Sequence, residues 1–287
     1  MKRFALFVLG LFFGCGLLEA PAKAFGFGKK GPRIVLAYWG DQINPIGGYA
    51  KGQGWLADTQ CLEYIKEGTE LDIVKLGSGK IGRFKARGFT PPSEEPPDAG
   101  TVYIEGSSNT SDLNITGVEP ILCILDPGGK PPKANVIPSP KQKHKELALD
   151  YLAEMGIKSE GAKGLNISQV VEADIDGDGK AETFISAQSS RDYLIFWGQS
   201  GPLYSFLVMV KSTNGKERFY PVYKEKFDSP EEAGVSVKAE LMGLWDLNGD
   251  GVLEVIAQEA YYEGESFVIY SFDGEGFADK ASWGAGL

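Results

Sequence analysis

Short apolar runs separated by glycine- and proline-rich turns dominate the first half of the chain, and such runs predict β-structure. Five runs have strand character, and each is bounded by turn residues. Between the first two of them, Trp55–Lys66 has the spacing of a short helix. We therefore expect strands at Ile34–Trp39, Leu71–Leu76, Ile81–Ala86, Thr101–Glu105 and Pro120–Leu125.

The clearest predicted helix follows residues 127–140, a stretch with five prolines that predicts a linker. Ser139 is a good N-cap and Pro140 a good first helical residue. Apolar residues then recur at helical spacing until Gly156 stops the run. These apolar residues are Ala148, Tyr151, Leu152 and Met155. We expect the basic residues around His144, the only histidine, to lie on the solvated face of this helix.

The C-terminal half contains two units in which a strand, an acidic loop and a second strand follow one another. The strands of the two units are Gln169–Ala173 with Thr183–Ala187, and Glu240–Trp245 with Val255–Gln258. A further aromatic-rich strand is expected after each unit, at Tyr193–Trp197 and at Phe267–Phe272. Each acidic loop is therefore expected to form the tip of a β-hairpin.

The two loops, Asp174–Glu182 and Asp246–Glu254, align residue for residue at a separation of 72 positions. Acidic or amide side chains occupy positions 1, 3, 5 and 9, and glycines occupy positions 4 and 6. Ca²⁺ takes roughly six to eight oxygen ligands, and glycine permits the positive φ that folds a short loop back on itself. The pattern predicts two Ca²⁺ sites, with side-chain ligands Asp174, Asp176, Asp178 and Glu182 in the first loop and Asp246, Asn248, Asp250 and Glu254 in the second.

An EF-hand is excluded for both loops. It requires a helix on each side and a carboxylate at the twelfth position of the loop. That position holds Ile185 in the first unit and Ala257 in the second. The calcium loops must therefore belong to a different class.

The loops resemble the FG-GAP and VCBS class of repeats, the short calcium loops of integrin-type β-propeller blades and of many exported bacterial proteins. The resemblance implies that the backbone carbonyls of Lys180 and Val252 complete the two ligand sets. The order helix, strand, loop, strand and second loop, from Lys145 onward, also resembles that of uncharacterised exported bacterial proteins.

These elements predict a mainly β protein with one amphipathic helix, of the α+β class. We expect an N-terminal β domain at residues 34–126, the linker at 127–140, and a helix plus two calcium-loop hairpins at 141–287. A partial or small β-propeller is the alternative architecture.

The N-terminus has the organisation of a secretory signal peptide. A basic start precedes the apolar stretch 5–18, and Ala22-Lys-Ala24 forms a small-x-small cleavage site. We expect removal of residues 1–24, a mobile leader at 25–33, and export to the periplasm or the extracellular space. Lipid attachment at Cys15 is the alternative. The apolar stretch is shorter than the roughly 20 residues that span a bilayer, so no membrane span is expected in the mature chain.

Cleavage of the signal would leave two cysteines, Cys61 and Cys123. Exported proteins favour disulfides, so a Cys61–Cys123 bridge is expected. A pair of buried free thiols is the alternative.

The net charge of −10 argues against nucleic acid or anionic membranes as partners. A single histidine leaves no Ser-His-Asp or Cys-His system, and zinc sites need more His or Cys. Carboxylate-pair chemistry stays open, because it needs only Asp and Glu. The candidates follow the second loop beside two tyrosines, where they could line a sugar-binding groove or form a charged sheet edge. They are Glu259, Glu263 and Glu265, with Tyr261 and Tyr262.

The sequence therefore predicts an exported calcium-binding module without catalytic activity. In it, calcium-rigidified hairpins support the structure or present loops to an unidentified protein or glycan. The alternative function is a carboxylate-dependent hydrolase, of glycosidase type, that calcium stabilises.

Overall fold

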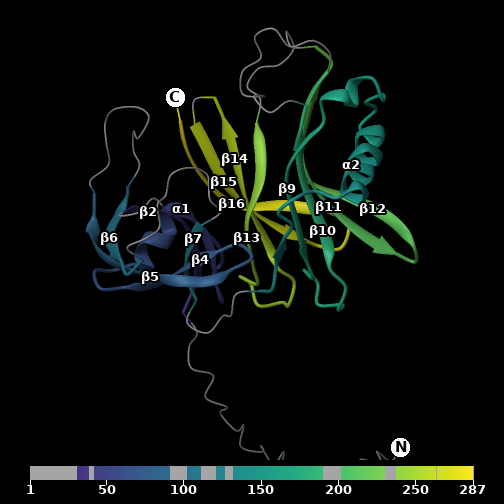
Figure 1. Ribbon diagram of the computed structural model, residues 1–287. Coiled ribbons are helices and arrows are strands. Elements are labelled where there is room, and N and C mark those ends of the chain that lie inside the picture. The colour runs from purple at the N-terminus through teal and green to yellow at the C-terminus, as the bar shows by residue number, and fades with distance from the viewer. Residues whose placement is uncertain are drawn as a thin grey trace, which may run out of the picture. The chain divides into compact units, whose positions relative to one another are not determined.

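Three antiparallel β-sheets make up most of the described chain, which is mainly β as the apolar pattern predicts (Figure 1). The computed structural model describes residues 31–38, 42–90, 102–110, 121–126, 132–189, 202–229, 237–262 and 264–286. These residues all belong to one unit, Gly31–Leu287. The predicted signal peptide, Cys15 and the predicted strand Tyr193–Trp197 lie outside the described residues.

The first sheet closes into a six-stranded barrel, in the order β1, β7, β4, β5, β6 and β2, because β1 pairs with both β7 and β2. A further strand, β3, pairs with β2 outside the closed ring, and a short helix α1 and a 3-10 turn η1 follow it. The bounds are β1 (Arg33–Tyr38), β2 (Gln42–Ala50), β3 (Gly54–Ala57), α1 (Asp58–Cys61), η1 (Leu62–Tyr64), β4 (Glu70–Lys75), β5 (Gly79–Phe89), β6 (Ile104–Ser108) and β7 (Ile121–Leu125).

Barrel strand β1 is apolar on both faces because it has a hydrophobic core on each side. Ile34 and Leu36 belong to the cluster inside the barrel. Val35 and Ala37 belong to a different cluster, which joins the barrel to the third sheet. The continuous apolar run that predicts this strand therefore reflects burial on two sides.

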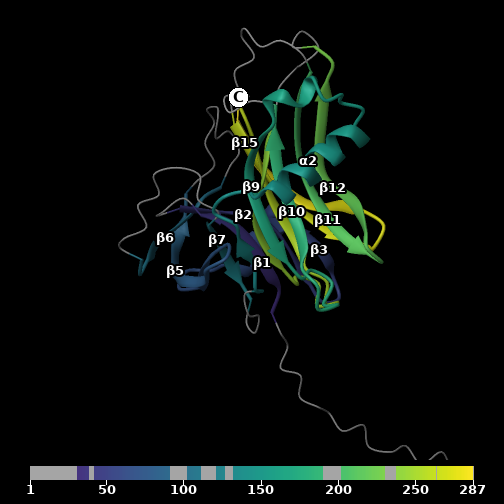
Figure 2. The same cartoon turned by 45° about the vertical axis from the view of Figure 1, so that its right-hand side comes forward.

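The second sheet has the order β12, β11, β10, β9, β8, and helix α2 lies along one of its faces (Figure 2). Ala148, Tyr151 and Leu152 of α2 share a buried cluster with Ile185 and Phe206 of the sheet, which confirms the predicted apolar face. The bounds are β8 (Asn135–Val136), α2 (Gln142–Glu154), η2 (Gly161–Gly164), β9 (Asn166–Ala173), β10 (Glu182–Gln188), β11 (Leu203–Thr213) and β12 (Lys216–Phe227).

The third sheet, in the order β13, β14, β15, β16, is packed between the second sheet and the barrel. Val255 and Ala257 of β14 face the second sheet, and Ile256 between them faces the barrel. At Gly47 of β2 the barrel approaches so closely that a Cβ would lie 2.3 Å from Ala281. The bounds are β13 (Lys238–Trp245), β14 (Glu254–Tyr261), β15 (Gly264–Phe272) and β16 (Phe277–Gly286).

The three sheets are thus stacked face to face, unlike the blades of the alternative β-propeller. The barrel strands come from residues 33–125 and the other two sheets from residues 135–286. The predicted strands leave out β2, β3, β8, β11, β12 and β16. The predicted helix at Trp55–Lys66 is α-helical only at Asp58–Cys61.

The prediction that His144 is solvated was wrong, because its side chain is fully buried. Nδ1 of His144 accepts a hydrogen bond of 3.1 Å from the backbone N–H of Lys141 and so caps the start of α2. Burial, together with the nearby Lys143 charge, lowers the pKa of His144. The helical period could have shown this burial, since residue 144 shares a face with Ala148 and Tyr151.

The structure does not contain the predicted Cys61–Cys123 disulfide. Both thiols are free, and both are buried in the cluster inside the barrel. Burial and the charge of Asp58 raise the pKa of Cys61 to about 12, so its reactive thiolate is scarce near neutral pH. An even cysteine count carries no information on the distance or direction that a disulfide requires.

Candidate metal centre

Both acidic loops connect antiparallel strands: the first joins β9 to β10 and the second joins β13 to β14. The glycines at positions 4 and 6 take positive φ in both loops. Their φ values are 72° at Gly177, 84° at Gly179, 82° at Gly249 and 91° at Gly251. The repeated glycine positions in the sequence therefore correspond to a repeated backbone conformation.

In the first loop, three carboxylates bind the loop's own backbone, and that of Asp178 accepts the N–H of Lys180 (2.8 Å). The Asp174 carboxylate accepts hydrogen bonds from the N–H groups of Gly177 (2.8 Å) and Gly179 (2.9 Å). Glu182, 2% exposed, accepts the N–H of Ile175 with Oε2 (3.0 Å). The Oε1 atom of Glu182 accepts a hydrogen bond from the Lys211 ammonium (2.9 Å).

Three acidic side chains of the first loop converge. Asp174, Asp176 and Glu182 each offer an oxygen, and these oxygens lie within 4.8 Å of one another. The Nζ of Lys211, on β11, lies 2.5 Å from Asp176 Oδ2, 2.9 Å from Glu182 Oε1 and 3.4 Å from Asp178 Oδ2. Burial lowers the pKa of Lys211, but its hydrogen bonds to Asp176 and Glu182 outweigh burial and raise that pKa overall.

The second loop repeats this frame with a neutral amide at its centre. Glu254, 1% exposed, accepts the N–H of Leu247 with Oε2 (2.7 Å), as Glu182 does with Ile175. Nδ2 of Asn248 donates to Glu254 Oε1 (3.0 Å) and to Asp250 Oδ2 (2.8 Å). Asn248 thus contacts the carboxylates at positions 5 and 9, as Lys211 does in the first loop.

Burial raises the pKa of Glu254 to about 7. That pKa already includes the opposing hydrogen bond from the Leu247 N–H and the smaller raising effect of the Asp250 and Asp246 charges. The carboxyl of Glu254 is therefore buried among like charges, an arrangement that a bound cation would relieve.

The barrel holds the second loop through Arg33. Its guanidinium donates to the backbone carbonyl of Asp246 and lies 3.7 Å from the Asp246 carboxylate and 3.5 Å from that of Asp126. Asp126 also accepts the indole N–H of Trp245 (2.9 Å). A residue of β1 thereby contacts the loop that joins β13 to β14.

The two loops also touch each other. The backbone N–H of Leu253 donates to the carbonyl of Ile175 (2.7 Å). Nearby, Gln169 of β9 exchanges two hydrogen bonds with the backbone of Leu241 on β13 (2.9 and 3.0 Å). The acidic loops therefore lie at a junction of all three sheets.

Sequence reasoning identified the acidic residues of both loops but missed Lys211 and Arg33. The structure brings Asp174, Asp176 and Glu182 together, with Asp178 at the edge of this group. Lys211 follows the last residue of the apolar run in β11, and none of the predicted elements covers this strand. The ligand roles of the Lys180 and Val252 carbonyls stay predictions.

Of the carboxylates proposed for hydrolysis, the two that the structure describes, Glu259 and Glu265, do not form a pair. The register of β14 and β15 sets Glu259 opposite Ser266 and Ala260 opposite Glu265, so Glu259 and Glu265 lie on opposite faces of the third sheet. Glu259 accepts the hydroxyl of Tyr270 (2.5 Å). Burial raises the pKa of both carboxyl groups. Glu263 lies outside the described residues.

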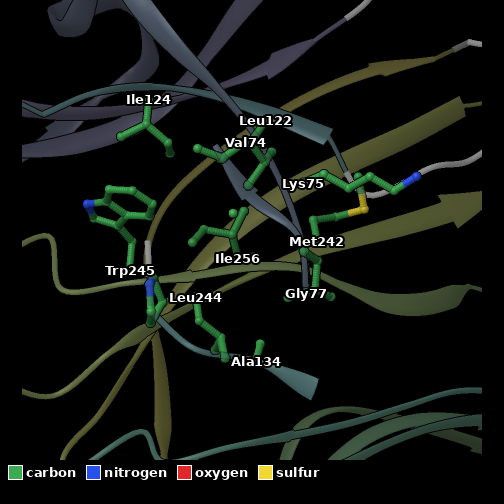
Figure 3. Close-up of a pocket in the computed structure, with 14 residues that line it drawn as sticks. Val74, Lys75, Gly77, Leu122, Ile124, Ala134, Met242, Leu244, Trp245 and Ile256 are labelled. Atoms are coloured by element: carbon green, nitrogen blue, oxygen red, sulfur yellow. The ribbon is translucent and has the colours of Figure 1, made fainter. Parts of the chain in front are cut away.

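A small apolar cavity lies between the barrel and the third sheet (Figure 3). Its volume is about 30 Å³, enough for one or two water molecules. Val74 and Leu122 line it from the barrel, and Met242 and Ile256 from the sheet. We interpret it as a packing gap because ligand pockets are roughly tenfold larger.

Comparison of the chain with protein-family models, curated proteins and solved structures gave no match. The resemblance of the loops to FG-GAP and VCBS repeats therefore rests on the loop residues alone. None of the helices among the described residues has the length and apolarity to cross a membrane.

Proposed function

We propose that the protein is an exported calcium-binding module without catalytic activity, in which Ca²⁺ stabilises both acidic loops. The convergence of Asp174, Asp176 and Glu182 carries this proposal. Among the described residues, Asp176 Oδ1 is buried without a hydrogen-bond partner. A buried oxygen of this kind calls for a cation or a donor, and carboxylate oxygens suit Ca²⁺.

The second loop supports a second site because it repeats the backbone frame of the first. Position 9 of each loop is a buried glutamate that leaves Oε1 for the centre of the loop. The raised pKa of Glu254 means that its ionised form is unfavourable in the second loop, and a divalent cation would stabilise that form. The carbonyls of Lys180 and Val252 would complete the two ligand sets.

The location of the loops favours a structural role for calcium. Through Leu253 and Ile175 the two loops bond to each other, and through Arg33 the second loop bonds to the barrel. With a dissociation constant of about 10⁻⁴ M and millimolar Ca²⁺, each site would add about 1.4 kcal/mol to the free energy of unfolding. Calcium would thus fasten the three sheets at their junction.

A partner would be an unidentified protein or glycan. Tyr262, at the hairpin between β14 and β15, is 72% exposed and could contact either. Export, whether to the periplasm or the extracellular space, would supply calcium and a partner. Among the described residues, Glu259 and Glu265 lie on opposite faces of the third sheet, so these two carboxylates do not favour the alternative hydrolase.

Isothermal titration with Ca²⁺ tests the proposal. We expect two equivalents to bind, and Asp178→Ala and Asp250→Ala each to remove about one equivalent because each deletes a ligand. EDTA should lower the melting temperature, and added Ca²⁺ should restore it.

Asp273→Ala is a matched control. Asp273 accepts the N–H groups of Glu275 and Gly276, both at 2.9 Å, in a turn without an acidic cluster. This variant should keep both equivalents. Absence of binding heat, together with a melting curve that EDTA leaves unchanged, would contradict the proposal.

A further inference from the structure

The first loop already contains a cation. Lys211 Nζ lies within 3.4 Å of carboxylate oxygens of Asp176, Asp178 and Glu182. These are three of the four side chains proposed as calcium ligands in this loop. The Lys211 ammonium therefore occupies the space where the ligand oxygens converge, and a Ca²⁺ ion there would be repelled by it.

The pairing of β10 with β11 places Lys211 beside these carboxylates. The register of β10 and β11 pairs Thr183 with Val210, so one residue further Lys211 stands opposite Glu182. The Lys211 side chain is only 17% exposed, and Glu182 beneath it is buried. Its charge is therefore screened much less than that of a surface lysine.

The second loop has no ammonium at the equivalent place. The register of β14 and β15 pairs Val255 with Tyr270, so one residue further Ser271 stands opposite Glu254. The donor at the centre of that loop is the neutral amide of Asn248. A calcium ion at the centre of the second loop meets this neutral amide, and the Arg33 guanidinium lies at the edge of the loop, 3.7 Å from the Asp246 carboxylate.

We propose that Lys211 is a built-in competitor for calcium at the first loop. Ca²⁺ binds there only by displacing the Lys211 ammonium toward solvent, so the second loop fills at lower calcium concentration than the first. The exchange involves no covalent step. The inference rests on the proposed function, because it assigns a regulation to one of the two proposed calcium sites.

The first test measures calcium affinity in the Asp250→Ala background, where the first loop binds alone. Lys211→Met should raise this affinity about tenfold or more, since it removes a charge within hydrogen-bonding distance of the ligands. The matched control is Lys216→Met, because Lys216 is exposed and lies on β12, outside both acidic loops. Its affinity should change by about threefold at most.

The reciprocal variant places the competitor in the second loop. In the Asp178→Ala background, Ser271→Lys should lower calcium affinity about tenfold by the same repulsion. This variant retains Lys211, so the test does not depend on the folding of Lys211→Met.

A third measurement uses the unmodified protein. Acylation of lysine amines, quantified by mass spectrometry, should increase at Lys211 when calcium is added, because the displaced ammonium becomes accessible. The exposed Lys216 should react equally with and without calcium.

The outcomes distinguish the role proposed for Lys211 from the proposed calcium-binding function. Failure of either loop to bind calcium would overturn both the inference and the proposed function. Two bound equivalents, with affinity unchanged in Lys211→Met and acylation of Lys211 indifferent to calcium, would overturn the inference alone.

Discussion

The two acidic loops share one backbone frame but balance their charges differently. The first has four carboxylates and one ammonium, that of Lys211, within hydrogen-bonding reach. The second has three carboxylates and the neutral amide of Asn248. The positive charge near the second loop is the Arg33 guanidinium, which lies at the edge of the loop, 3.7 Å from the Asp246 carboxylate, so the two loops differ in where the positive charge stands.

The charge at each site is set both by the loop residues and by one residue of a neighbouring strand. In the first loop, position 3 is Asp176 and the residue supplied by the neighbouring strand β11 is Lys211. In the second loop, position 3 is Asn248 and the residue supplied by the neighbouring strand β15 is Ser271. The loop residues alone therefore do not determine how readily a cation enters. A neighbouring strand supplies or withholds the competing charge.

The largest effect that separates the loops should come from removing Lys211 without calcium. In EDTA, Lys211→Met leaves Asp176 and Glu182 without their cation, and the free energy of unfolding should fall by about 3 kcal/mol. Urea denaturation measures this loss, and saturating calcium should reverse most of it. Ser271→Ala, at the equivalent position, should cost less than about 1 kcal/mol. Equal losses in the two variants would remove the distinction between the loops.

A second difference should appear in the pH dependence of stability. The pKa of Glu254 rises from 4.5 to about 7 on folding, so the folded protein holds a proton that the unfolded chain releases between these values. Stability in EDTA should therefore fall as pH rises from about 4.5 to about 7, by about 3 kcal/mol from this group. Urea midpoints at pH 5 and pH 8 measure the slope.

Glutamine variants isolate the contribution of each glutamate. Glu254→Gln should flatten the slope and stabilise the calcium-free protein at pH 8, because it removes a buried charge. Glu182→Gln should destabilise at the same pH, because Lys211 loses a charged hydrogen-bond partner. Shifts of the same sign would show that the loops respond alike.

The local part of the site could be predicted from sequence. Glycines and carboxylates at fixed spacing determine the turns and the capping hydrogen bonds, which join residues within seven positions of each other. Lys211 and Arg33 could not be predicted in this way. Lys211 stands 29 positions from Glu182 and Arg33 stands 213 from Asp246, so only the sheet register and the packing of the barrel bring them in.

The fold likewise has features that the sequence predicts and features that it does not. Apolar runs predict single strands such as β1 and β14, but barrel closure depends on β1 pairing with the distant strand β7 as well as with the adjacent strand β2. The β11–β12 hairpin was within reach of sequence analysis. Its turn is Asn214-Gly215 with φ values of 54° and 75°, a strong short-range hairpin signal.

The smallest difference should lie in the glycines at position 4. Alanine at Gly177 or Gly249 must adopt positive φ, which costs about 1 kcal/mol in either loop. A Cβ at Gly177 would meet nothing within 4 Å, whereas one at Gly249 would lie 3.4 Å from the Arg33 guanidinium. That distance is an ordinary van der Waals contact, so Gly177→Ala and Gly249→Ala should differ in unfolding free energy by less than about 0.5 kcal/mol. A much larger loss in Gly249→Ala alone would mean that the contact between Arg33 and Asp246 tolerates no displacement, and that the second loop depends on the barrel more than on its own ligands.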